Sequence, residues 1–202
     1  MKHYANVAAF VLAGGASTRM GRDKALLELG GAPMIARTAR LAGEHVASVT
    51  VVGPPERYAS LGLGVVADRW SGTGPLGGIA TALCASSSEW NLILGCDLPC
   101  LTAKWIDWLI AWARESSAQA AVPESERGLE PLAAMYRKDC DPAFTAALDR
   151  GVRRISEALQ EIVFERVTAD QWREIEPADN LFQNVNTPED FAEAQRWIAT
   201  MA

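Results

Sequence analysis

Short apolar runs alternate with amphipathic stretches along the chain. Runs of this length are typical of strands that are covered on both faces of a sheet. We therefore expect strands at residues 7–13, 48–53, 64–68, 90–97, 119–124, 129–137, 162–167 and 181–186. Apolar residues spaced three and four apart predict helices between the strands. These helices are expected at residues 33–44, up to about 85, 102–115, 142–150, 154–160 and 188–200.

This alternation predicts an α/β fold in three layers, with helices on both faces of a mostly parallel sheet. No repeat or Gly/Ser-rich linker interrupts it, so we expect one domain over residues 1–202. In such sheets ligands bind outside the carboxyl ends of the strands. Three features fall at expected carboxyl ends: the segment LAGGASTRMGRDK of residues 12–24, Asp68 and Asp97. The sequence therefore predicts a site at one rim of the sheet.

The segment of residues 12–24 is suited to binding a phosphate group. Gly14, Gly15 and Gly21 let a ligand approach the backbone N–H groups. Arg19 and Lys24 add positive charge that hydrogen bonds to phosphate oxygens. The spacing matches neither the Walker loop nor the GxGxxG fingerprint. A glycine-rich turn with surface charges is the alternative interpretation.

The acidic residues of the rim and the last helix also have ordinary structural interpretations. Asp68 can pair with the neighbouring Arg69, and Asp97 can act as a helix cap before the sequence LPCLT. Thr187 and Asp190 have nearly the spacing of a capping box for the last helix. These interpretations compete with a functional role for the two rim aspartates.

Composition limits the classes of function. The 202 residues are 49% hydrophobic and 22% charged, the balance of a globular protein with a sizeable core. The formal net charge of −6 argues against a broad nucleic-acid surface. No run reaches the roughly 18 apolar residues of a membrane span. The four cysteines form no paired CxxC framework, so we expect buried, reduced thiols and a cytoplasmic location.

Four motifs together carry a family resemblance. The pattern LAGGxSxRMGxDK at residues 12–24, followed by GPLGG, CDLP and NVNTPED, resembles the molybdenum cofactor guanylyltransferases. The resemblance extends from about Val7 to Phe191. It implies a three-layer, Rossmann-like nucleotidyltransferase fold. It also implies an enzyme that transfers GMP from GTP to molybdopterin (Mo-molybdopterin) and releases pyrophosphate.

The resemblance implies roles for individual residues. The GTP site would comprise Leu12, Ala13, Gly14, Gly15, Lys24, Asp68, Gly78 and Asp97, with Pro75 and Leu76 shaping the base pocket. Arg19, Lys24 and Asp97 would be catalytic, and Asp97 would hold Mg2+. The molybdopterin side would comprise Arg153, Arg154, Asn184 and Asn186. The two arginines also fit the solvated start of a helix.

Two glycines bear on the choice of base. The sister family that makes the cytosine dinucleotide reads LAAG where this chain reads LAGG, so Gly14 is expected to leave room for guanine. Gly53 falls where certain members place an asparagine that touches the nucleotide. Three other functions stay open: a CTP-dependent molybdopterin cytidylyltransferase, a sugar-phosphate nucleotidyltransferase and a non-catalytic nucleotide sensor.

The resemblance implies partners as well. These are the substrates GTP and molybdopterin, with transient contacts to other molybdenum cofactor biosynthesis proteins or to recipient apoenzymes. Neither nucleic acid nor a membrane is expected among them.

Overall fold

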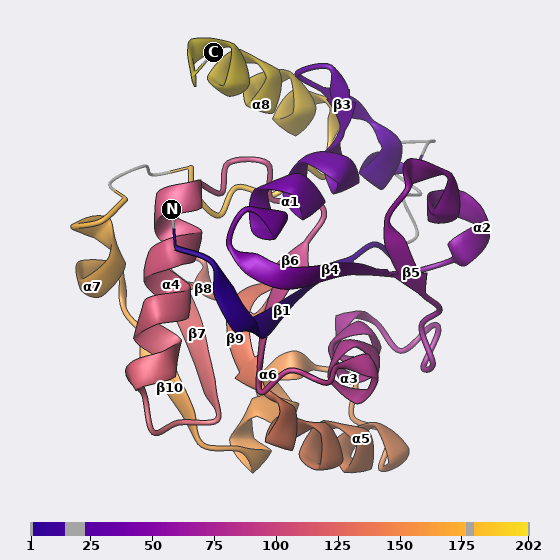
Figure 1. Cartoon of the computed structure of the whole chain (residues 1–202), viewed down its shortest axis with the longest axis vertical. Coiled ribbons are helices and arrows are strands. Elements are labelled where there is room, and N and C mark those ends of the chain that lie inside the picture. Colours follow the sequence, from indigo (N-terminus) through magenta and orange to yellow (C-terminus); the bar gives the residue numbers. More distant parts are fainter. Residues whose placement is uncertain (1, 15–22, 177–179, 202) are drawn as a thin grey trace.

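A twisted sheet with helices on both faces forms the body of this computed structural model, which describes residues 2–14, 23–176 and 180–201 (Figure 1). The strands are β1 (Tyr4–Leu12), β4 (Val46–Val52), β5 (Gly64–Val66), β6 (Trp90–Gly95), β7 (Ala120–Ser125), β8 (Gly128–Leu129), β9 (Ala133–Arg137) and β10 (Phe164–Val167). A separate small hairpin consists of β2 (Glu28–Leu29) and β3 (Ala32–Pro33).

The helices follow the strands in nearly regular alternation. They are α1 (Met34–Gly43), α2 (Pro55–Tyr58), α3 (Pro75–Ala85), α4 (Ala103–Glu115), α5 (Asp141–Asp149), α6 (Ile155–Ala158), α7 (Ala169–Arg173) and α8 (Pro188–Met201). Short 3-10 turns lie at η1 (Lys24–Leu26), η2 (Ala59–Leu61), η3 (Lys138–Cys140) and η4 (Leu159–Glu161). None of the helices in the described ranges is long and apolar enough to cross a membrane.

The sheet is mostly parallel, as expected for the predicted fold class. Its strand order is β10-β7-β9-β6-β1-β4-β5, with β8 paired to β7. The strands β6, β1, β4 and β5 run parallel to one another, and so do β10 and β7. Strand β9 is antiparallel to both of its neighbours, β6 and β7. The carboxyl ends of β1, β4, β5 and β6 therefore meet at one rim.

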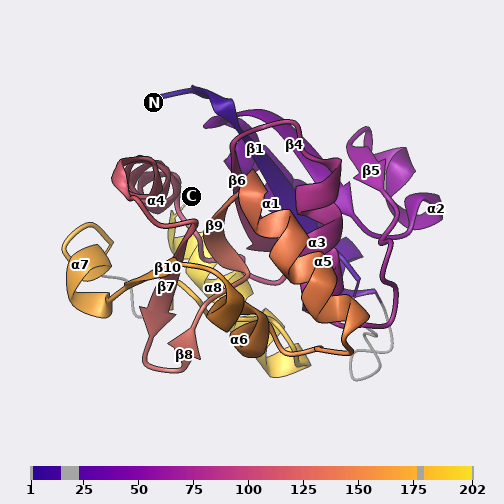
Figure 2. The same cartoon turned by 90° about the horizontal axis from the view of Figure 1, so that it is seen from below.

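Side chains of alternate strand positions pack into hydrophobic clusters on opposite faces of the sheet. In β1, Val7 and Ala9 pack on the face covered by α1 and α4, whereas Ala8 and Phe10 pack on the face covered by α3, α5 and α6. Figure 2 shows α3 and α5 side by side across the second face. This arrangement is the three-layer α/β fold that the alternation of elements predicts.

One predicted strand is wrong. Residues 181–186 form a turn and an irregular segment in place of a strand. Leu181 and Phe182 are adjacent in sequence and both are buried in the same core, which the alternating faces of a strand do not allow. The N–H of Val185 donates to the carbonyl of Asp97 at 2.9 Å, so the segment is hydrogen bonded to a loop of the rim.

Other differences concern short elements. The predicted strand at residues 129–137 is broken by a turn at residues 131–132: Leu129 ends β8, which pairs with β7, and the second part, β9, lies between β6 and β7. The helices α2 and α7 have four and five residues, too few for a periodic pattern. Cys96, Cys100 and Cys140 are buried and unbridged as expected, whereas Cys84 is half-buried.

Candidate active site

A cavity of about 250 Å³ lies at the rim where the parallel strands end. The ends of β1, β4 and β6, the segment after β5 and the first turn of α3 contribute to its wall. The lining residues are Leu12, Ala13, Gly14, Lys24, Val52, Asp68, Gly74, Pro75, Gly78, Gly95, Cys96, Asp97 and Leu132. The fold therefore places a cavity where open α/β sheets bind their ligands.

Most residues that the sequence assigns to the GTP site line this cavity. They are Leu12, Ala13, Gly14, Lys24, Asp68, Pro75, Gly78 and Asp97. Leu76 instead points into the core beneath α3, where it is fully buried. The predicted roles of Gly15, Arg19 and Gly21 fall outside the described residues.

Three segments that are far apart in sequence meet at Lys24. Its ammonium donates to the carboxylate of Asp97 at 2.5 Å and to the side-chain oxygen of Asn186 at 3.1 Å. The side chains of Lys24 and Asp97 are 19% and 18% exposed, so the ion pair lies at the wall of the cavity and is still reached by water. A cation and a carboxylate in contact beside a cavity are the elements needed to bind a phosphate and a metal ion.

The local sequence explains why Lys24 and Asp97 come together. Asp23 is the N-cap of η1, and its side chain accepts a hydrogen bond from the N–H of Ala25 at 3.1 Å. This cap fixes the start of the turn at Lys24. Asp97 follows the fully buried strand β6, which lies next to β1 in the sheet. The Asp23 cap was not predicted, although an Asp before a short helical turn is a usual cap signal.

Asp97 does not cap the helix that follows it. The hydroxyl of Thr102 accepts from the N–H of Trp105 at 3.2 Å and is the cap of α4. The capping box expected for α8 is present, because Thr187 and Asp190 exchange hydrogen bonds of 2.8 Å and 3.1 Å. The carboxylate of Asp97 is therefore not needed for a helix end.

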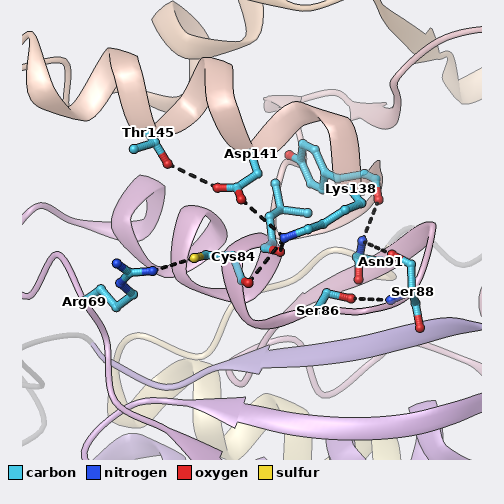
Figure 3. A network of polar contacts seen from close by, with 10 residues as sticks. Arg69, Cys84, Ser86, Ser88, Asn91, Lys138, Asp141 and Thr145 are labelled. Atoms are coloured by element: carbon cyan, nitrogen blue, oxygen red, sulfur yellow. Dashed lines mark hydrogen bonds and ion pairs between the residues drawn. The ribbon is translucent and has the colours of Figure 1, made fainter.

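Asp68 is held on α3. Its carboxylate accepts hydrogen bonds from the N–H of Trp70 and the hydroxyl of Thr81, both at 3.0 Å. Among the ion pairs of the described residues, none joins Asp68 to Arg69. The Arg69 guanidinium lies against the thiol of Cys84 on α3 instead (Figure 3). Asp68 thus lines the cavity as part of a fixed wall.

Helix α3 is anchored at both ends. Figure 3 shows Lys138 reaching the last turn of α3, where its ammonium donates to the carbonyls of Leu83 and Cys84. At the other end Gly78 lies so close to β1 that a Cβ there would meet Leu12 at 3.1 Å. The first turn of α3 faces the cavity, and the amino end of a helix attracts anions. This end of α3 therefore adds to the positive potential of the cavity.

Two further residues limit what the cavity can do. Burial raises the pKa of the Cys96 thiol to about 12, so this lining residue is a protonated thiol near neutral pH in the protein without a bound metal. Gly53 lies against the back of the cavity wall, where a Cβ would come within 2.3 Å of the Ala13 carbonyl oxygen. An asparagine at position 53 therefore does not fit this backbone.

The residues assigned to molybdopterin fall into two places. Asn184 and Asn186 lie in the segment before α8, and Asn186 contacts Lys24. Arg153 and Arg154 lie between α5 and α6 and are not among the residues that line the cavity. The guanidinium of Arg153 donates to the carbonyls of Leu148 and Val152, at 3.0 Å and 2.8 Å. These carbonyls lie in the last turn of α5 and in the loop after it.

Comparisons with known proteins find relatives over most of the chain. Residues 9–163 match the family model of the MobA-like NTP transferase domain. A "probable molybdenum cofactor guanylyltransferase" of Nostoc sp. is 36% identical over 198 residues, 94% of this chain and 91% of the relative. A "molybdenum cofactor guanylyltransferase" of Syntrophotalea carbinolica is 31% identical over 193 residues, 93% of this chain and 90% of the relative. The crystal structure of molybdopterin-guanine dinucleotide biosynthesis protein A from Archaeoglobus fulgidus superposes with a TM-score of 0.84 at 22% identity, covering 96% of this chain and all of the other.

Proposed function

Because the chain belongs to the MobA-like NTP transferase family, among relatives that are molybdenum cofactor guanylyltransferases, we propose that it transfers GMP from GTP to molybdopterin. The products are the guanine dinucleotide form of the cofactor and pyrophosphate. The observation that carries this proposal is the contact between Lys24 and Asp97 at the wall of one cavity. A carboxylate beside the cation can hold a metal ion at the reacting phosphate, which favours a transferase over a module that only binds a nucleotide.

The proposed reaction is an in-line displacement at the α-phosphorus of GTP. An oxygen of the terminal phosphate of molybdopterin forms the new P–O bond while the bond to pyrophosphate breaks. The attacking phosphate is already anionic, so catalysis consists of positioning and charge neutralisation and needs no protein base. This agrees with the lining of the cavity, which contains no histidine among the described residues.

Within this reaction Lys24 neutralises the triphosphate and the departing pyrophosphate. When GTP binds, the Lys24 ammonium exchanges its contact with Asp97 for contacts with phosphate oxygens. The backbone of Gly14 and the first turn of α3 are exposed to the bound nucleotide. Arg19 is proposed to act beside Lys24, from outside the described residues.

The carboxylate of Asp97 fits a Mg2+ ion. It is a hard oxygen ligand that already binds one cation, the ammonium of Lys24. The described residues contain no group of three or more His, Cys, Asp or Glu side chains that could hold a metal by themselves. This agrees with Mg2+, which is commonly bound through one or two carboxylates together with substrate phosphates. When bound, the ion supplies positive charge at the reacting phosphate.

The acceptor is proposed to bind beside Lys24, on the side of the segment before α8. The support is the 3.1 Å contact between Lys24 and Asn186, because it joins that segment to the triphosphate site. Asn184 belongs to the same segment and is half-buried. Arg153 and Arg154, in the loop between α5 and α6, stay candidates for molybdopterin binding. Contacts to other cofactor biosynthesis proteins or apoenzymes, and the cytoplasmic location, stay predictions.

A pyrophosphate-release assay tests the proposal. Purified protein is incubated with GTP, CTP or ATP, with Mg2+ or with EDTA, and with or without molybdopterin. We expect release only with GTP, Mg2+ and molybdopterin together. Preference for CTP would assign the chain to the cytidylyltransferases. Release with a sugar phosphate in place of molybdopterin would make it a sugar-phosphate enzyme, and GTP binding without turnover would make it a sensor.

A further inference from the structure

A buried tyrosine lies behind the cavity and contacts the turn that carries Lys24. Tyr58 is the last residue of α2 and only 2% exposed. Its hydroxyl donates to one carboxylate oxygen of Asp23 at 2.8 Å. The other carboxylate oxygen accepts from the N–H of Ala25. One side chain, Asp23, thus joins α2 to η1, where Lys24 is the first residue.

We propose that Tyr58 is a positioning residue of the transferase, which acts through Asp23 to hold Lys24 at the triphosphate. This inference rests on the proposed function and adds a residue to it. Tyr58 does not line the cavity and touches no reacting atom. Its effect is to fix the backbone from which the Lys24 side chain reaches the cavity wall.

The surroundings of Tyr58 make this contact well defined. Its ring packs in one core cluster with Ala13, Ala25 and Cys96, that is, directly behind the cavity wall and the turn. Gly53 allows this approach, since a Cβ there would lie 2.9 Å from the ring. Burial and the neighbouring Asp23 both raise the pKa of the Tyr58 hydroxyl, which therefore stays a donor at any working pH.

Arg57 also contacts Asp23, but it holds the carboxylate less firmly. Its guanidinium is 3.4 Å from the carboxylate and its side chain is 58% exposed. An exposed ion pair of this kind is worth little, whereas a hydrogen bond from a buried hydroxyl to a charged acceptor is among the stronger ones. The buried hydroxyl of Tyr58 is therefore the main anchor of Asp23.

The chain offers a matched control at the other end of the sheet. The hydroxyl of Tyr4 donates to the carboxylate of Asp107 at 3.0 Å, and Tyr4 is 7% exposed. Tyr4→Phe removes the same kind of hydrogen bond as Tyr58→Phe, at the amino end of β1 and away from the cavity. A purely structural role of Tyr58 predicts the same behaviour for both variants.

The first experiment measures GTP affinity by calorimetry in EDTA, GTP kinetics with Mg2+, and Tm. We expect Tyr58→Phe to weaken GTP binding and kcat/KM by about 10-fold, the scale of one hydrogen bond to a charged group. For Tyr4→Phe we expect GTP affinity and kcat/KM to stay within about twofold of wild type. The Tm is expected to fall in Tyr58→Phe and in Tyr4→Phe. If wild type binds GTP and Tyr58→Phe behaves like Tyr4→Phe, the inference is wrong. If wild type neither binds GTP in EDTA nor turns it over with Mg2+, the proposed function itself fails.

A double-mutant cycle then tests whether Tyr58 acts through Lys24. In the Lys24→Ala background, Tyr58→Phe is expected to change GTP affinity by less than about twofold, because the group that it positions is gone. Equal effects of Tyr58→Phe in both backgrounds would show an independent role and overturn the inference. Tyr4→Phe serves as the control in the same cycle.

Discussion

The two ends of strand β1 carry similar polar chemistry but differ in their surroundings. At the amino end Tyr4 donates to Asp107, and a ring nitrogen of His45 lies 3.9 Å from the same carboxylate. At the carboxyl end Tyr58 donates to Asp23, and the neighbouring Lys24 pairs with Asp97. Both ends thus combine a tyrosine, an aspartate and a basic group.

The difference lies in access to a cavity. His45 is 1% exposed, and neither of its ring nitrogens has a hydrogen-bond partner among the described residues. Lys24 and Asp97 are partly exposed and line a cavity. Both ends of β1 have clustered polar groups, so such a cluster alone does not indicate a function. At the carboxyl end, Lys24 and Asp97 lie at a cavity, where a ligand can replace their contact with each other.

The test with the largest expected effect replaces an aspartate by asparagine at each end of β1. Asp97→Asn keeps the size of the side chain but removes its charge, so we expect turnover with GTP and Mg2+ to fall by about 1,000-fold, at the upper end for a lost transition-state contact. The Tm is expected to change little, because Thr102 and not Asp97 caps α4. Asp107→Asn is expected to lower Tm and leave turnover within about twofold. Normal Mg2+ dependence in Asp97→Asn would contradict the metal role.

Removing the cation is expected to have the next largest effect. Lys24→Ala takes away one preorganised charge at the triphosphate, which should lower kcat by about 100-fold. Steady-state kinetics at saturating GTP measure it. The exposed Lys104 supplies the control, since Lys104→Ala removes a lysine of α4 that does not line the cavity. Turnover of Lys24→Ala close to that of Lys104→Ala would remove Lys24 from the mechanism.

A methyl group added inside the cavity tests the choice of base. A Cβ at Gly14 would meet no described atom within 4 Å, so Gly14→Ala is expected to fold normally and to protrude into the space for the ligand. We expect kcat/KM for GTP to fall by roughly 10- to 200-fold without good use of CTP.

The matched control for Gly14 is Gly43→Ala at the end of α1, where the methyl group meets Val49 at 3.6 Å. Kinetics of both variants with GTP, CTP and ATP are compared. An unchanged preference in Gly14→Ala, or a wild type that prefers CTP, would contradict the assignment of guanine.

The smallest expected effect is a pH dependence of stability at the amino end. Burial lowers the pKa of His45, and the nearby Asp107 only partly opposes this. The unfolded chain binds a proton below the ordinary histidine pKa of about 6.5, while folded His45 stays neutral. The Tm should therefore fall as the pH drops below about 6.5 and level off above it.

The variant His45→Gln is expected to flatten this dependence. His3→Gln is the control, because His3 is the other histidine of the chain and is exposed. Thermal melts between about pH 5 and 8 measure both. A wild-type slope that survives in His45→Gln and disappears in His3→Gln would show that the titrating group is not buried.

Much of the site could be predicted because the apolar runs of the sequence indicate where the strands end. The apolar runs of β1, β5 and β6 place Lys24, Asp68 and Asp97 at one rim, and the structure brings all three to one cavity. The antiparallel direction of β9 could not be predicted, because the same apolar run fits a parallel and an antiparallel strand. The contact of Lys24 with Asn186 and the role of α2 depend on tertiary packing between distant segments, which periodicity does not report.

The order of the strands in the sheet differs from their order of synthesis at β9. Strand β9 is made after β6 and β7, yet it lies between them, and β7 joins the sheet only through it. A growing chain that ends before residue 133 therefore exposes one edge of β6, all six residues of which are buried in the finished protein. An exposed apolar edge is a template for aggregation. Translation of β9, at residues 133–137 of 202, therefore covers this edge of β6 and removes one site of self-association.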